Sequence, residues 1–127
     1  MKQARFGRIV LLSSRAALGA ATRTVYSATK AGIIGMARTW ALELAPFGIT
    51  VNVVAPGPIG DTEMFESVMS PESERAKKLA QSIPLGRLGT SADVARAVTF
   101  FSSPDADFIT GQTLYVCGGA SIGSISI

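Results

Sequence analysis

The hydrophobic positions of this chain fall into short unbroken runs that alternate with longer stretches of helical periodicity. Three of the runs are bounded by Gly, Ser or Pro: residues 7–14 (GRIVLLSS), 48–57 (GITVNVVAPG) and 111–119 (GQTLYVCGG). Continuous apolar runs of this length are typical of strands that are buried on both faces of a parallel sheet. We therefore predict three strands at these positions.

The stretches between these runs predict helices. Five apolar residues after the first run recur at helical spacing: Ile33, Ala37, Trp40, Ala41 and Leu44. This pattern ends at Pro46. A second helix is predicted over residues 90–103, because Thr90-x-x-Asp93 has the form of a capping box and a proline follows the segment. Strands and helices that alternate in this order predict an α/β fold with a parallel sheet.

Residues 60–88 differ in character from the rest of the chain. The segment is rich in charge, contains two prolines, and is expected to form short amphipathic helices with Met64, Phe65, Val68 and Met69 on one side. Insertions that follow the carboxyl end of a strand in an open α/β sheet often cover a ligand. We predict that this segment is a substrate lid.

Composition and charge narrow the class of protein. The 127 residues suit one domain, and 47% hydrophobic residues with 17% charged residues are enough for a core. Cys117 is the single cysteine and histidine is absent, which excludes an internal disulfide, a Cys/His zinc site and a histidine-based triad, and favours a reducing, cytoplasmic setting. No apolar run approaches the ~18 residues of a membrane span, so we expect no membrane association. The net charge of +3 comes from scattered arginines without interleaved aromatic residues, so we expect no nucleic-acid partner.

Candidate chemistry gathers where the predicted strands end. Tyr26 and Lys30 lie four positions apart at the start of the first helix, and so on one helix face. Such a pair alone also fits an ordinary solvated face. However, Ser13 and Ser14 close the first strand and residues 56–62 (PGPIGDT) close the second. Ligands of doubly wound sheets bind outside the carboxyl ends of the strands, which is where these groups converge.

Taken in order, these motifs resemble a known family. The series SS, YSATKAG, NVVAPGPI, RLGTSADVA and ITGQTLYVCGG, between residues 7 and 119, is similar to the C-terminal half of a short-chain dehydrogenase/reductase, in particular the 3-oxoacyl-acyl carrier protein reductases. The resemblance implies half of a Rossmann-type, doubly wound parallel sheet. Residues 1–127 would form a single C-terminal portion of that domain, and the N-terminal dinucleotide-binding half, with its Gly-rich turn, is absent from the sequence.

The resemblance also implies a reaction. The cofactor would be NAD or NADP, and the sequence leaves the choice between them open. The substrate would be a small ketone or the matching secondary alcohol, with a 3-oxoacyl thioester as one candidate. The resemblance further implies a homo-oligomer, a dimer or a tetramer. The alternative function that we carry forward is a non-catalytic half-domain that acts as an assembly element.

The family pattern assigns three catalytic residues. Tyr26 would exchange a proton with the substrate oxygen, Lys30 would favour the phenolate and hold the nicotinamide ribose, and Ser14 would bind the substrate oxygen. An ammonium ~5 Å from a phenolate stabilises it by roughly 3 kcal/mol at an effective dielectric of ~20. Ser14 lies twelve positions before Tyr26, whereas many family members have thirteen, so Ser13 is the alternative. Residues on successive strand positions face opposite ways, so only one of the two can serve.

The same pattern assigns the cofactor contacts. Tyr26 and Lys30 would touch the nicotinamide ribose. The remaining contacts are expected in the loop after the second strand: Pro56, Gly57, Ile59 and Thr62. No metal ligands are predicted.

Overall fold

The computed structural model describes residues 1–122 and contains a three-stranded parallel sheet. The strands are β1 (Gly7–Leu12), β2 (Ile49–Pro56) and β3 (Thr113–Val116), in the order β1-β2-β3. Gly7 lies opposite Ile49, and Val53 lies opposite Thr113. All three strands occur within the predicted runs, each shorter than its run. The predicted α/β class is confirmed.

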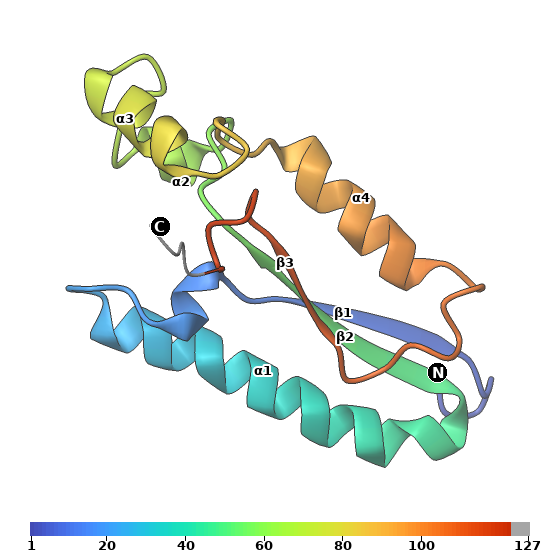
Figure 1. The fold of residues 1–127 in the computed structure, drawn as a ribbon. Coiled ribbons are helices and arrows are strands. Elements are labelled where there is room, and N and C mark those ends of the chain that lie inside the picture. Colours follow the sequence, from blue (N-terminus) through green and yellow to red (C-terminus); the bar gives the residue numbers. More distant parts are fainter. Residues whose placement is uncertain (123–127) are drawn as a thin grey trace.

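Two helices cover the sheet from opposite sides. Helix α1 (Thr24–Leu44) lies along one face, and α4 (Ser91–Ser102) lies along the other, as Figure 1 shows. The Thr90–Asp93 capping box predicted for α4 is present. The carboxyl ends of the strands, the amino end of α1 and the C-terminal turn all lie toward the same edge of the sheet (Figure 1).

The core is divided in two by β2, whose first seven residues are buried. Val51 and Val53 point toward α1, where they pack on Ala37 and Ala41. Val54 points the other way and belongs to a second cluster, with Ala97 and Phe101 of α4. Side chains of a strand alternate between its two faces, which is why one apolar run supplies both clusters.

The buried Asn52 joins β2 to the segment that leads into β3. Its Nδ2 donates to the carbonyl of Ile109 at 2.8 Å, and its Oδ1 accepts from the N–H of Gln112 at 3.0 Å. The side chain is completely buried at 0% exposure. Because its amide donates once and accepts once, this polar group is compatible with the core.

Helix α1 ends in a short 3-10 helix, η2 (Ala45–Phe47), followed by Gly48 in the left-handed conformation (φ 69°). A Cβ at Gly48 would collide with the carbonyl oxygen of Arg5. The outer face of α1 is open within this chain: no atom lies within 4 Å of a Cβ built at Gly32 or Gly35. The low helix propensity of these two glycines therefore has no explanation in packing within the described residues.

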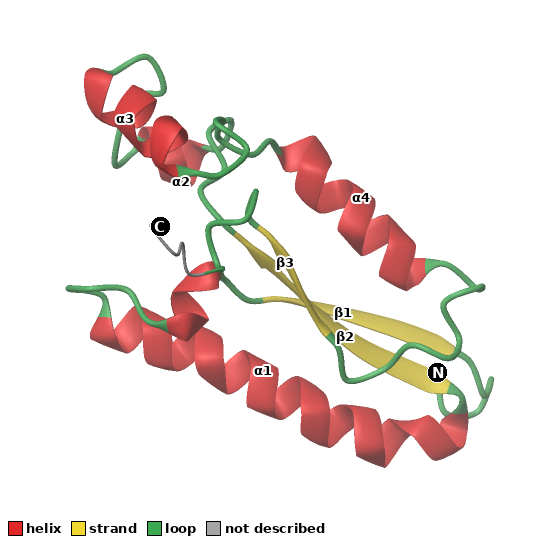
Figure 2. Cartoon of the chain, in the orientation of Figure 1, coloured by secondary structure: helices red, strands yellow, loops and turns green. Residues whose placement is uncertain are grey.

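The predicted lid, residues 60–88, forms short helices as expected, but its predicted apolar side is not found on one helix. It contains α2 (Glu63–Glu66) and α3 (Glu74–Ser82), which lie beyond the carboxyl edge of the sheet (Figures 1 and 2). Helix α2 ends before Val68, so the predicted apolar stripe of residues 64–69 is not the face of one helix. Met64 and Val68 are 72% and 55% exposed. The hydroxyl of Ser67 bonds back to the carbonyl of Met64 at 2.9 Å, a contact that competes with continuation of the helix.

Within residues 1–122, no helix combines the length and the apolar character that crossing a membrane requires.

Candidate active site

Tyr26 and Lys30 occupy the first two turns of α1 and meet as their spacing predicts. The Nζ atom of Lys30 lies 5.7 Å from the centre of the Tyr26 ring. The same ammonium donates to the carbonyl of Leu12, the last residue of β1, at 3.2 Å. Tyr26 remains 38% exposed, so a ligand can reach its side chain. The phenol and the ammonium thus stand together at the carboxyl edge of the sheet.

Ser13 ties the end of β1 to α1. Its N–H extends the sheet by donating to the carbonyl of Val54 at 2.9 Å. Its hydroxyl donates to the backbone carbonyl of Lys30 at 2.7 Å, and the residue is only 5% exposed. Because α1 and β1 are joined twice, by this bond and by the bond from Lys30 Nζ to Leu12, the position of Lys30 is fixed from both sides.

Ser14 differs from its neighbour. It caps the short 3-10 helix η1 (Arg15–Leu18), and its Oγ accepts from the N–H of Ala16 at 3.1 Å. It is half-buried, unlike Ser13. A hydroxyl that accepts one hydrogen bond still has its own proton to donate. The proton of Ser13 is already committed to a backbone carbonyl.

Of the residues predicted to contact a cofactor in this region, Pro56 ends β2, and Gly57, Ile59 and Thr62 lie in the loop that follows. Its first turn continues the β2–β3 pairing, because the N–H of Gly57 donates to the carbonyl of Val116 at 2.9 Å. Close packing requires glycine there: a Cβ on Gly57 would lie 2.8 Å from the Cβ of Cys117. Since Leu12 and Val54 are opposite each other in the sheet, this loop begins beside the end of β1.

The rest of that loop is held by its own hydrogen bonds. The hydroxyl of Thr62 donates to the carbonyl of Ile59 at 3.2 Å and accepts from the N–H of Phe65 at 3.2 Å, which caps α2. Ile59 also pairs with Gly89 in an isolated parallel bridge. The structure therefore brings Tyr26 and Lys30 together and ties Lys30 to Leu12, two residues before Ser14, while the predicted cofactor residues lie at the end of β2 and in the loop after it.

Two hydrogen-bonded carboxylates near the base of the predicted lid were not predicted as part of a site. Asp61 accepts from the N–H and hydroxyl of Ser91, at 2.7 and 3.0 Å. Asp93 receives two bonds from Arg87, at 2.7 and 3.2 Å. The Arg87 hydrogen bonds, together with bonds from the Thr90 backbone and hydroxyl, hold the pKa of Asp93 far below its usual range. The capping box is a sequence signal for Asp93, whereas no local pattern links Asp61 to a residue thirty positions away.

Cys117 directly follows β3 and is a buried thiol that is 8% exposed. Burial raises the pKa of the thiol, but the hydrogen bond with Ser121 and the backbone N–H groups of residues 119–121 outweigh it, so the pKa is lowered overall. The thiol lies 3.1 Å from the hydroxyl of Ser121. Arg15, which follows Ser14, reaches the same turn through the carbonyl of Ala120 at 3.3 Å. The C-terminal turn thus contacts both loops of the site.

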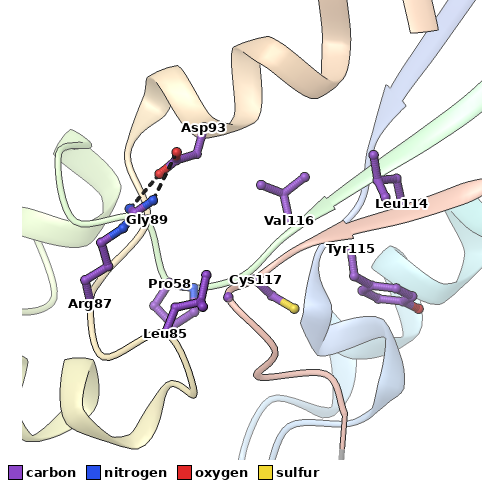
Figure 3. Close-up of a pocket in the computed structure, with 10 residues that line it drawn as sticks. Pro58, Leu85, Arg87, Gly89, Asp93, Leu114, Tyr115, Val116 and Cys117 are labelled. Carbon is purple, nitrogen blue, oxygen red and sulfur yellow. Dashed lines mark hydrogen bonds and ion pairs between the residues drawn. The ribbon is translucent and has the colours of Figure 1, made fainter. Parts of the chain in front are cut away.

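A cavity of about 270 Å³ lies between residues 85–89, the start of α4 and the end of β3. Figure 3 shows Leu114 and Val116 on one side of β3 and Tyr115 on the other, with the Arg87–Asp93 pair at the far end. Its lining is Pro58, Leu85, Arg87, Gly89, Asp93, Leu114, Tyr115, Val116, Cys117 and Gly118. Among residues 1–122, the lining includes neither Ser14 nor the Tyr26–Lys30 pair, so this cavity lies apart from the predicted reaction centre.

Comparison with known proteins identifies the family. Residues 1–121 match the sequence profile of a family described as "Enoyl-(Acyl carrier protein) reductase", which is part of the short-chain dehydrogenases/reductases. The chain belongs to the short-chain dehydrogenase/reductase family. The resemblance that the motifs indicated is confirmed.

The names of two curated relatives refer to coenzyme A or to acyl carrier protein. One is subunit BbsD of (2S)-[(R)-hydroxy(phenyl)methyl]succinyl-CoA dehydrogenase from Thauera aromatica, which is 47% identical over 122 residues, 96% of this chain and 48% of the relative. Another is the 3-oxoacyl-[acyl-carrier-protein] reductase FabG of Haemophilus influenzae, 46% identical over 94% of this chain and 48% of the relative. The chain therefore spans about half the length of the curated relatives it matches.

Solved structures of short-chain dehydrogenases/reductases have the same arrangement. ElxO with NADP bound superposes with a TM-score of 0.85 at 35% identity, over 94% of this chain and 48% of that one. The F189W actinorhodin polyketide ketoreductase with NADPH gives a TM-score of 0.84 at 33% identity, over 95% of this chain and 49% of that one. The three strands and flanking helices are thus half of a family domain.

Proposed function

We propose that this chain is the catalytic half of an NAD(P)(H)-dependent short-chain oxidoreductase that interconverts a ketone and a secondary alcohol. The observation that carries the proposal is the grouping at the carboxyl end of β1. Lys30 Nζ stands 5.7 Å from the Tyr26 ring and bonds to Leu12. A phenol with an ammonium beside it suits proton transfer to an oxygen, because the cation stabilises the phenolate that forms.

Tyr26 would donate its hydroxyl proton to the carbonyl oxygen of a ketone, or accept a proton from an alcohol in the reverse direction. Lys30 would stabilise the phenolate that remains. Ser14 would donate a hydrogen bond to the same substrate oxygen, since its proton is not needed by its contact with Ala16. Ser13 is unsuited to that role because its hydroxyl already bonds to the Lys30 carbonyl.

The residues present fit the nicotinamide end of a dinucleotide. The Lys30 ammonium can donate to ribose hydroxyls. Pro56 and the loop with Gly57, Ile59 and Thr62 follow Val54, which is opposite the Leu12 that Lys30 bonds to. When bound, the nicotinamide would supply or take the hydride. The Gly-rich, phosphate-binding turn is not in this sequence, so we propose that the other half of the domain completes the cofactor site. An in-frame upstream reading frame that encodes such a turn would support this division.

The substrate class that we propose is an acyl thioester that carries a 3-oxo or 3-hydroxy group. Two of the relatives described above are named for substrates on coenzyme A or acyl carrier protein. Residues 60–88 would form the lid over such a substrate, and the enzyme would work in the cytoplasm. Titration of the enzyme with NADH and with NADPH would determine which of the two cofactors it binds more tightly.

Tyr26→Phe tests the proposal in the polypeptide that includes both halves of the domain. Loss of the hydroxyl removes the proton donor and keeps the ring, so we expect turnover of a 3-oxoacyl thioester to fall by more than about 10³-fold. Binding of NADPH or NADH, followed by fluorescence, should change less than about threefold. Near-normal turnover by the variant would refute the catalytic assignment and favour the alternative, an assembly element without chemistry.

We also propose that the chain assembles as a dimer or tetramer. Met36 and Trp40 lie one turn apart on α1 and are 38% and 36% exposed, and no atom lies within 4 Å of a Cβ built at Gly32 or Gly35. An apolar helix face with room for close approach suits packing against a second helix. Light scattering at micromolar concentration should give a multiple of the chain mass, and Trp40→Lys should reduce it. A wild-type monomer would contradict this expectation.

A further inference from the structure

The lid is a loop whose two ends are joined at its base. It leaves the sheet after β2 and returns to α4. At its base the departing and returning segments of the chain run side by side. Ile59 and Gly89 form a parallel bridge, the N–H of Gly60 donates to Gly89 at 2.9 Å, and the N–H of Gly89 donates to Pro58 at 2.9 Å. A Cβ on Gly89 would collide with the Ile59 side chain, so the two segments are in close contact.

Asp61 connects the departing side of this base to α4, as Arg87 connects the returning side through Asp93. The Oδ1 atom of Asp61 accepts from both the N–H and the hydroxyl of Ser91, at 2.7 and 3.0 Å. Ser91 is the first residue of α4, and its N–H has no acceptor within the helix. A carboxylate at this end also interacts favourably with the helix dipole. Asp61 therefore fastens the departing end of the lid to a helix that packs on the sheet.

Asp61 lies within the loop predicted to touch the cofactor. It is two residues after Ile59 and directly before Thr62, and the hydroxyl of Thr62 bonds to the Ile59 carbonyl at 3.2 Å. The backbone on both sides of Asp61 thus belongs to one small hydrogen-bonded turn. Fixing the Asp61 carboxylate also fixes the carbonyl of Ile59 and the hydroxyl of Thr62.

The far end of the lid has its own attachment. The N–H of Leu85 donates to the carbonyl of Gly118 at 3.2 Å. A Cβ on Gly119 would lie 3.0 Å from Pro84, so the lid rests on the C-terminal turn there. With that contact at one end, the Asp61–Ser91 bonds join the departing end of the lid to α4.

We propose that Asp61 is a positioning residue, which holds the cofactor loop in its binding geometry by anchoring the lid base to α4. The role in cofactor binding rests on the proposed function. The anchoring role is independent of it, because it concerns contacts within this chain alone.

Hydrogen exchange of the 127-residue chain tests the anchor without a cofactor. A hydrogen bond to a charged group is worth about 1.5–3 kcal/mol, so Asp61→Ala should make the amides of Ser91, Gly60 and Gly89 exchange at least about tenfold faster. Asp61→Asn keeps an oxygen acceptor at the same place and should restore most of the protection. The matched control is Asp105→Ala, on the exposed loop after α4, which should leave these amides unchanged.

The second measurement uses the polypeptide with both halves of the domain and an NADPH or NADH titration. Asp61→Ala should raise KM for the cofactor by about fivefold with kcat within about twofold, because binding geometry changes and the proton donor does not. Asp61→Asn should recover most of the affinity. A variant that only destabilised the fold would lower the unfolding temperature without changing KM of the folded fraction.

Unchanged exchange at Gly60 and Gly89 in Asp61→Ala would overturn the anchor, and so would failure of Asp61→Asn to restore protection. If Asp61→Ala does not fold, Ser91→Ala replaces it. This variant removes only the 3.0 Å bond, and about threefold faster exchange is then expected, with no change as the contradicting result. An unaffected KM would overturn the role in cofactor binding even where the anchor is present. Loss of the proposed function is read separately, from Tyr26→Phe.

Discussion

The loops that follow β1 and β2 begin side by side at one edge of the sheet, yet they are held in different ways. The first is fixed by nearby chain: Ser13 and Leu12 bond to Lys30, 17 and 18 positions away. The second is fixed by distant chain: Asp61 bonds to Ser91, 30 positions away, and Gly57 packs on Cys117. The proposed catalytic residues thus belong to a local strand–helix unit, whereas the proposed cofactor residues depend on α4 and the C-terminal turn.

The largest expected difference between variants concerns Ser13 and Ser14, which begin the first of these two loops. In the complete enzyme, Ser14→Ala should lower kcat by about 10²- to 10³-fold, as loss of one hydrogen-bond donor to a reacting oxygen does. Ser13→Ala should leave kcat within a few-fold and lower the free energy of unfolding by about 1 kcal/mol, because it removes the bond to the Lys30 carbonyl. Turnover assays and urea unfolding of both variants measure this. The reverse pattern would assign the catalytic role to Ser13.

The next largest effect is expected for Gly57→Ala, which changes the loop after β2 and leaves the loop after β1 unchanged. The added Cβ would lie 2.8 Å from Cys117 Cβ and 2.9 Å from its Cα, so the loop or the turn must move. We expect a loss of about 1–3 kcal/mol in unfolding free energy, with weaker NADPH or NADH binding.

Gly35→Ala is the matched control for that substitution. It places the same methyl group in open space on α1 and should stabilise the chain by up to ~1 kcal/mol. Thermal unfolding compares the two variants. Destabilisation by Gly35→Ala would indicate that a second subunit covers this face.

The smallest effect concerns pH. Hydrogen bonds from Arg87 and Thr90 depress the pKa of Asp93 in the folded protein, so this carboxylate favours folding above its unfolded pKa of about 3.9 and loses that contribution as the pH falls below it. Asp93→Asn should therefore be less stable than wild type at pH 7, with the difference narrowing toward pH 2. Urea unfolding across that range tests it, with Asp105→Asn as the control. A difference that stays constant with pH would show that the ion pair contributes nothing.

The sequence predicted the fold well because its signals are local. Unbroken apolar runs gave the three strands, and Thr90-x-x-Asp93 gave the start of α4. In residues 60–88 the short helices were foreseen but the apolar stripe was not confirmed, since Met64 and Val68 are exposed and their spacing reflects no buried face. Side-chain contacts in the β1–α1 unit were partly foreseen, because i, i+4 spacing places Lys30 beside Tyr26. The hydrogen bond of the Ser13 hydroxyl was not predicted. Its acceptor is a backbone carbonyl, and every residue type has one, so the sequence does not identify the partner.

The contacts of Asp61 could not be predicted at all. Asp61 lies in a Gly- and Pro-rich segment whose composition is typical of a turn. Nothing in the neighbouring sequence identifies Ser91 as the donor to its carboxylate. Interactions of this kind appear only when two segments far apart in the sequence are placed together by the sheet. This is the physical reason why the contacts of the β1–α1 unit were more predictable than those of the loop after β2.

The amide of Asn52 has a consequence for how the chain folds. Asn52 and Ile109 are 57 positions apart, so pairing β2 with β3 closes a long loop. Closing such a loop is entropically costly and slow. Apolar side chains alone tolerate several alignments, but a shift of β3 by one residue would turn its side chains to the wrong faces and leave both ends of the buried amide without partners. Asn52 therefore favours one register of β3: misaligned intermediates lose both of its hydrogen bonds and are less stable.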